Sequence, residues 1–188
     1  MLGFFKKESL EPIEIQREDV MKYEEPIRSE ILNGEDCDQI EEAYGEFGSN
    51  TNPIPVNGVM GEIKYLGKLR GKTDNALFFH RKRSTTSPIC KYRVDIYETV
   101  CMDAAQWKTF YFDFYHPRRS NIAPPGYSLM SYDKTLKFDI PCAYGVDFPV
   151  KDFPYGLPDA LVEFFGEGIG RTFGRRAREN LNKANFKK

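Results

Sequence analysis

The sequence contains few of the residue types and spacings that identify a metal site or a disulfide framework. Its 188 residues include two histidines and four cysteines, and the two closest cysteines, Cys90 and Cys101, are 11 positions apart. Zinc ribbons and dithiol redox motifs need cysteines about two to four positions apart, so both are excluded. We expect no metal and buried free thiols, which is typical of a cytoplasmic protein.

Catalytic and membrane signatures are missing as well. No stretch approaches the roughly 20 apolar residues that a membrane span requires. The nucleophile motif Gly-x-Ser-x-Gly, the phosphate loop Gly-x-x-x-x-Gly-Lys and the zinc motif His-Glu-x-x-His are all absent from the sequence. We therefore expect no cofactor. Whether the protein is an enzyme stays open, and a non-catalytic role is favoured.

Aromatic residues, in contrast, are abundant. With 15 Phe and 11 Tyr, the chain is 14% aromatic and 40% hydrophobic, which argues against a disordered protein. Its length fits one domain of ordinary size with a small appendage. We place the boundary near residue 50, with residues 1–50 as an acidic lead-in and residues 51–188 as a single α+β domain that ends in a helical segment.

Charge is distributed unevenly along the chain. Residues 1–50 contain five Lys and Arg against fourteen Asp and Glu, so this acidic front has a net charge of −9. The remaining 138 residues contain 22 basic and 14 acidic side chains, a net charge of +8. Either the front packs against the basic body of its own chain, or one of the two surfaces meets a charged partner.

The hydrophobic periodicity predicts an α+β fold built on an antiparallel β-meander of four to six strands, within about residues 61–141. The clearest strand is 107–116, in which Phe110, Phe112 and Phe114 alternate with more polar residues, as a half-buried strand requires. The other expected strands are 63–70, 76–81, 92–102 and 135–140. Helices are expected at 34–47, from Pro158 with Leu161, Phe164 and Phe165 as its apolar face, and at 171–182, which is strongly basic.

Such a meander would gather basic residues at one edge of the sheet. The second and fourth strands end where the third begins, because neighbouring strands alternate in direction. The predicted patch consists of His80, Arg81, Lys82, Arg83, Arg93, His116, Arg118 and Arg119. It could bind an anion, an acidic protein surface or nucleic acid, or it could pair with the acidic front of its own chain.

Two phrases resemble specific fingerprints rather than ordinary loops. One is Asn-Pro-Ile-Pro-Val-Asn-Gly from residue 52, and the other is Phe-Tyr-His-Pro-Arg-Arg-Ser from residue 114. Pro117 ends a strand and fixes the exit of the chain, so Arg118 and Arg119 leave the sheet from a defined point. Neither phrase indicates an activity by itself.

The sequence therefore predicts a non-catalytic accessory or interaction protein that binds an acidic partner through this patch. The alternative is a phosphoester-processing enzyme with His80 and His116 as its acid and base, which would require the two rings to converge on one pocket. The identity of the partner and the oligomeric state are left open.

Overall fold

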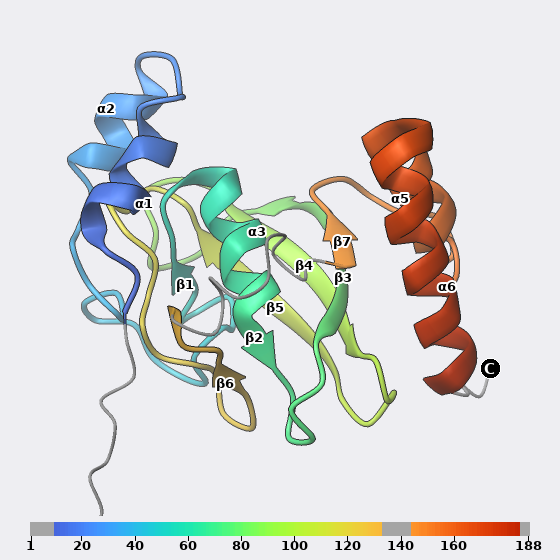
Figure 1. Ribbon diagram of the computed structural model, residues 1–188. Helices are drawn as coiled ribbons and strands as arrows, with labels where there is room; N and C mark the ends of the chain where they lie inside the picture. Colours follow the sequence, from blue (N-terminus) through green and yellow to red (C-terminus); the bar gives the residue numbers. More distant parts are fainter. Residues whose placement is uncertain (1–9, 133–143, 185–188) are drawn as a thin grey trace, which may run out of the picture.

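The computed structural model describes residues 10–132 and 144–184, and it shows an α+β fold with a mixed sheet of five strands in the order β1-β5-β4-β3-β7. These strands are β1 (Ile54–Pro55), β3 (Leu77–Thr85), β4 (Val94–Cys101), β5 (Trp107–Asp113) and β7 (Tyr144–Val146). A second, two-stranded sheet pairs β2 (Leu69–Arg70) with β6 (Ser128–Leu129). Figure 1 shows the larger sheet in the middle of the molecule, with helices on both sides.

The α+β class is confirmed, but the prediction of a simple meander is wrong. The three long strands β3, β4 and β5 are antiparallel neighbours, as expected. At the two edges, however, β1 runs parallel to β5 and β7 runs parallel to β3. Each edge strand has only two or three residues, too few to show a period in the sequence.

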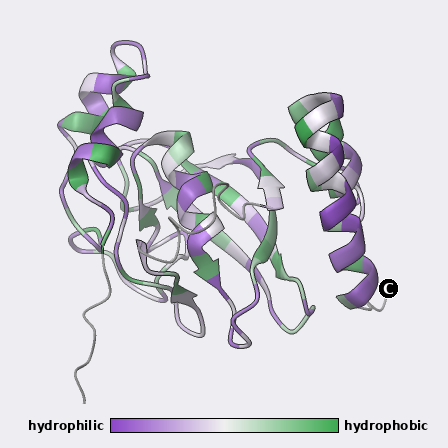
Figure 2. Ribbon diagram, in the orientation of Figure 1, coloured by the Kyte–Doolittle hydropathy of each residue, from purple (hydrophilic) through white to green (hydrophobic). Residues whose placement is uncertain are grey.

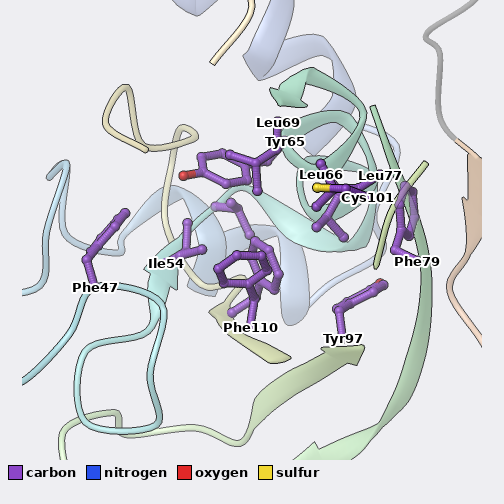
Figure 3. Close-up of a cluster of buried hydrophobic side chains, with 12 residues drawn as sticks. Phe47, Ile54, Tyr65, Leu66, Leu69, Leu77, Phe79, Tyr97, Cys101 and Phe110 are labelled. Atoms are coloured by element: carbon purple, nitrogen blue, oxygen red, sulfur yellow. The ribbon is translucent and has the colours of Figure 1, made fainter. Parts of the chain in front are cut away.

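The first predicted strand, 63–70, is largely helical. Residues Gly58–Lys68 form helix α3, and the chain becomes extended only at β2. The buried residues Glu62, Tyr65, Leu66 and Leu69 follow a helical spacing. Figure 3 shows Tyr65, Leu66 and Leu69 facing Ile54 and Phe110, and these residues belong to one buried cluster between α3 and the sheet.

The N-terminal helices also differ from the prediction. They are α1 (Ile13–Val20) and α2 (Ile27–Leu32), whereas 34–47 contains no helix. Glu42 and Gly45 in this segment have φ angles of 61° and 82°, which a right-handed helix excludes. Tyr44, which a helix over 34–47 would place on one face with Ile40 and Phe47, is 59% exposed, whereas Phe47 is buried. The expected strand 135–140 lies outside the described residues.

The expected C-terminal helices are confirmed. Helix α5 (Leu157–Phe165) leads through a short π-helical stretch, η1 (Gly166–Gly170), into α6 (Arg171–Ala184), which is mainly hydrophilic in Figure 2. Leu161 is buried against Phe78 on the second face of the sheet, in a separate cluster. Phe164 and Phe165, expected on the apolar face, are instead 52% and 40% exposed. In the described part of the chain, no helix has the length and apolar character needed to cross a membrane.

Candidate functional site

The residues of the predicted patch are spread along the sheet rather than gathered at one edge. Strand β3 continues to Thr85, so His80, Arg81 and Arg83 lie within the strand, opposite residues of β4. Arg93 directly precedes β4, and His116 follows the end of β5, so these two residues are at the expected edge. The prediction ended the strand too early because a run of basic residues was taken as a loop.

His80 is buried, and both of its ring nitrogens have partners. Nδ1 accepts a hydrogen bond from the backbone N–H of Val150 at 3.0 Å, and Nε2 lies 3.0 Å from Oε2 of Glu98. The ring stacks on Phe153 with 4.4 Å between centroids. Burial lowers the pKa of His80, while the carboxylate of Glu98 opposes this effect. The contacts of His80 are those of a structural residue.

The structure does not bring His80 and His116 together. In the register of the sheet, His80 lies opposite Glu98, and Glu98 lies opposite Thr109. From Thr109 to the end of β5 at Asp113, the strand alone covers about 13 Å at ~3.3 Å per residue, and His116 lies beyond that point. An acid and a base acting on one bond must both be within hydrogen-bond reach of the substrate, so this spacing removes the basis for the two-histidine mechanism.

Most cations of the predicted patch are paired with carboxylates of the same chain. Nε of Arg81 lies 2.8 Å from Oδ2 of the buried Asp95, and Nζ of Lys82 lies 2.8 Å from Oε1 of Glu98. Arg118 reaches into the acidic front, where it pairs with Asp36 and with Asp38 at 2.6 Å. These charges are therefore satisfied internally.

Arg119 forms the most deeply buried of these clusters. Its side chain is 4% exposed, and its Nη2 lies 2.7 Å from Oε2 of Glu11. Nη1 donates to Oδ1 of Asn57 at 3.0 Å and lies 3.7 Å from Oδ2 of Asp19. The backbone N–H of Arg119 donates to Oε1 of Gln16 at 2.9 Å. The partners Glu11, Gln16 and Asp19 all belong to the acidic front, so Arg119 joins this front to the sheet.

The two fingerprint phrases are explained by this junction, because they lie side by side and hydrogen-bond to one another. The backbone N–H groups of Gly58 and Ser120 donate to the carbonyls of Phe114 and Pro55, each at 2.9 Å. His116 donates its backbone N–H to the carbonyl of Val56 at 3.2 Å. The pairing positions Asn57 for its contact with Arg119, which neither phrase shows alone.

One basic segment, residues 82–93, contains cations that are not paired with carboxylates. We call this segment the basic ridge. This segment contains Lys82, Arg83, Lys91 and Arg93 and has no Asp or Glu. Arg83, Lys91 and Arg93 are exposed, and within the described residues none of the three forms an ion pair. Nη2 of Arg93 donates to the carbonyl of Ser84 at 2.7 Å, which holds this guanidinium beside the strand residue that follows Arg83.

A buried acidic network was missed by the sequence analysis. Glu62 of α3 is fully buried and accepts a hydrogen bond from the hydroxyl of Tyr97 at 2.9 Å. Burial, together with the nearby charge of Asp95, raises the pKa of Glu62 well above its usual value and so favours the protonated carboxyl. Asp95 accepts from Ser84 Oγ at 2.6 Å and from Arg81. In the sequence, the sign of this network was a glutamate at a position that helical spacing places on the buried face. It was missed because the segment was interpreted as a strand.

Comparison of the chain with protein-family models, with curated proteins and with solved structures finds no match. The case for a function therefore rests on the geometry.

The burial of Arg119 predicts a large effect on stability. Arg119→Ala should lower the free energy of unfolding by about 3 kcal/mol, because it removes the buried guanidinium from Glu11 and Asp19 and leaves them only their lysine partners, Lys68 for Glu11 and Lys64 and Lys22 for Asp19. Arg118→Ala, the matched control, should cost about 1 kcal/mol or less, because Asp36 and Asp38 are 60% and 41% exposed. Urea denaturation measures both, and equal losses for the two variants would contradict the buried junction.

The raised pKa of Glu62 predicts a pH dependence of stability. Above the pKa of the unfolded chain, folding must return a proton to Glu62, so its contribution to stability declines as the pH rises toward the folded pKa. Glu62→Gln removes this proton uptake and keeps the hydrogen bond to Tyr97. Its free energy of unfolding should therefore rise relative to the wild type as the pH increases above 4.5, the usual pKa of a glutamate. The exposed control Glu163→Gln should follow the wild type at every pH. If the free energy of unfolding of Glu62→Gln also changes with pH in parallel with that of the wild type, Glu62 does not take up a proton on folding.

Proposed function

We propose that this protein is a non-catalytic binding protein that recognises an acidic partner through the basic ridge. The observation that carries the proposal is the difference, within the predicted patch, between two arginines of the ridge, Arg83 and Arg93, and the cations that are paired inside the chain. Arg81, Lys82, Arg118 and Arg119 are bound to carboxylates of the same chain. Arg83 and Arg93 keep their guanidiniums exposed, in a segment free of acidic residues.

The state of the thiols supports a role without catalysis. Burial, assisted by neighbouring carboxylates, raises the pKa values of Cys37 and Cys90 to about 12. A thiol acts as a nucleophile in its thiolate form, and these two are protonated at neutral pH. The separation of the two histidines also leaves no acid–base pair among the predicted site residues.

An acidic protein segment fits the ridge better than nucleic acid does. Single-stranded nucleic acid is commonly held by aromatic rings on which bases stack. Beside the ridge, Tyr115 lies between Tyr92 and Phe114, with centroid distances of 4.0 and 4.2 Å. Its two faces are therefore occupied within the chain. Guanidinium groups in exposed positions pair readily with carboxylates, and this does not need a stacking surface.

The proposal predicts that binding depends on two arginines. Arg83→Ala/Arg93→Ala should weaken binding of a fluorescent polyglutamate peptide by about tenfold, and it should reduce the dependence of affinity on salt. The matched control is Arg17→Ala/Arg175→Ala, which removes the same charge from two other exposed arginines. This control should bind within about twofold of the wild type.

Three results would contradict the proposal: unchanged binding in the ridge variant, equal weakening in both double variants, or no binding of polyglutamate by the wild type. A single-stranded oligonucleotide of the same charge serves as the competing probe. If it binds the ridge more tightly than the peptide does, the partner is nucleic acid and the assignment of an acidic protein partner is wrong.

A further inference from the structure

One side of strand β3 is only partly covered by a neighbouring strand. On its other side, β3 pairs with β4 along its whole length. On the partly covered side, β7 pairs only with residues 78–80 and ends opposite His80. In the described part of the chain, no strand continues along this side of β3 past His80. We call residues 82–85 of β3 the open edge.

The backbone groups of the open edge can still pair with another chain. Alternate residues of a strand direct their N–H and C=O groups to opposite sides, so only about half of these groups can bond to β4. Outside the ladder with β4, the described structure gives the backbone of residues 82–85 one hydrogen bond, from Arg93 Nη2 to the carbonyl of Ser84 at 2.7 Å. A row of unpaired backbone groups is a template for a further strand.

Cations lie on both faces of the sheet beside the open edge. The hydroxyl of Ser84 donates to Asp95 at 2.6 Å, so these two residues share a face, and the preceding Arg83 is on the other face because successive residues alternate. Arg93 lies two positions before Asp95, which places it on the same face as Asp95. Both arginines are exposed. An added strand with consecutive acidic residues would therefore meet a cation on each face.

The charges of the open edge select which strand can add to it. Charged side chains and β-bulges on edge strands commonly prevent pairing with other chains, and the register of β3 and β4 shifts between Arg81 and Arg83. A second copy of β3 would bring Arg83 close to another arginine, and like charges across two strands are destabilising. An acidic strand has the opposite effect, because its carboxylates pair with the guanidiniums. The edge therefore disfavours a second copy of the chain and favours an acidic segment.

We propose that the acidic partner binds as an extended segment that adds a strand to the five-stranded sheet along the open edge, with its carboxylates paired to Arg83 and Arg93. This inference rests on the proposed function and specifies how the partner is recognised. In this mode of recognition, main-chain hydrogen bonds contribute affinity and side chains contribute specificity. The open edge spans about 13 Å at ~3.3 Å per residue, which is longer than either β1 or β7 in the same sheet.

A comparison of two peptides tests whether the backbone of the partner takes part. Fluorescent polyglutamate should bind the full chain. A peptide of the same length and charge with a methyl group on every backbone nitrogen should bind at least about tenfold more weakly, because it has no N–H to donate. Binding of both peptides to polylysine is the control. The two affinities for polylysine should agree within about twofold, which shows that methylation leaves the charge attraction intact.

Amide hydrogen exchange, followed by NMR, locates the added strand on the protein. Saturation with polyglutamate should slow the exchange of at least one amide among residues 82–85 by about tenfold or more. Amides of the exposed turn at residues 72–74 serve as the control and should not change. The variant Arg83→Ala/Arg93→Ala should lose both the binding and the slowed exchange.

The possible outcomes separate strand addition from the proposed function. If polyglutamate binds through Arg83 and Arg93 but the methylated peptide binds equally well, the ridge recognises an acidic partner and strand addition is overturned. Binding without slowed exchange at any amide of the open edge overturns it as well. If polyglutamate does not bind at all, the proposed function fails, and strand addition fails with it.

Discussion

The buried ion pair of Arg119 is the constraint on which the rest of the structure depends. A guanidinium that is 4% exposed is costly to bury unless carboxylates accompany it. Glu11 and Asp19 provide them, and both come from the acidic front. The front therefore has to lie against the sheet for Arg119 to be satisfied. This contact also brings Gly34 close to the Tyr115 carbonyl, where a Cβ would be only 1.9 Å from the oxygen.

This arrangement accounts for the uneven charge along the sequence. A front with net charge −9 and a remainder with net charge +8 neutralise one another where they meet, through Lys64, Lys68, Arg118 and Arg119. The contact takes Arg118 and Arg119 out of the predicted basic patch, while Arg81 and Lys82 pair with carboxylates of β4. It also brings the turn after α2 to the end of β5, where the Glu35 carbonyl lies 2.8 Å from Nδ1 of His116.

Local patterns in the sequence predicted the parts of the fold that are locally determined. Strands β4 and β5 and helices α5 and α6 were predicted correctly. Their signals, the alternation of the strands and the prolines and glycines at the helix ends, each involve only a few neighbouring residues. Helix α3 was missed because Ile63 and Tyr65 also alternate, and only the packing against β1 and β5 selects the helical spacing. The edge strands β1 and β7 are defined by partners more than 50 residues away, and α1 and α2 by their contact with the body.

The same limit applies to the candidate site. The types of residue were visible in the sequence, and so was the possibility that Arg118 and Arg119 pair with the acidic front. Which acid meets which base depends on contacts across 80 residues or more, such as Arg118 with Asp38, and no local pattern encodes them. The surroundings of His116 could not be predicted for the same reason, since the Nδ1 partner is the carbonyl of Glu35, 81 positions away.

Hydrogen–deuterium exchange of the full chain tests the docking of the acidic front most directly. Helices α1 and α2 have eight and six residues, too few to be stable alone in water. Protection of their amides therefore reports contact with the body. The account predicts that amides of α1 exchange far more slowly than in an unfolded chain and lose this protection in Arg119→Ala while β4 stays protected. Unprotected α1 amides in the wild type would contradict it, because Arg119 would then lack its partners.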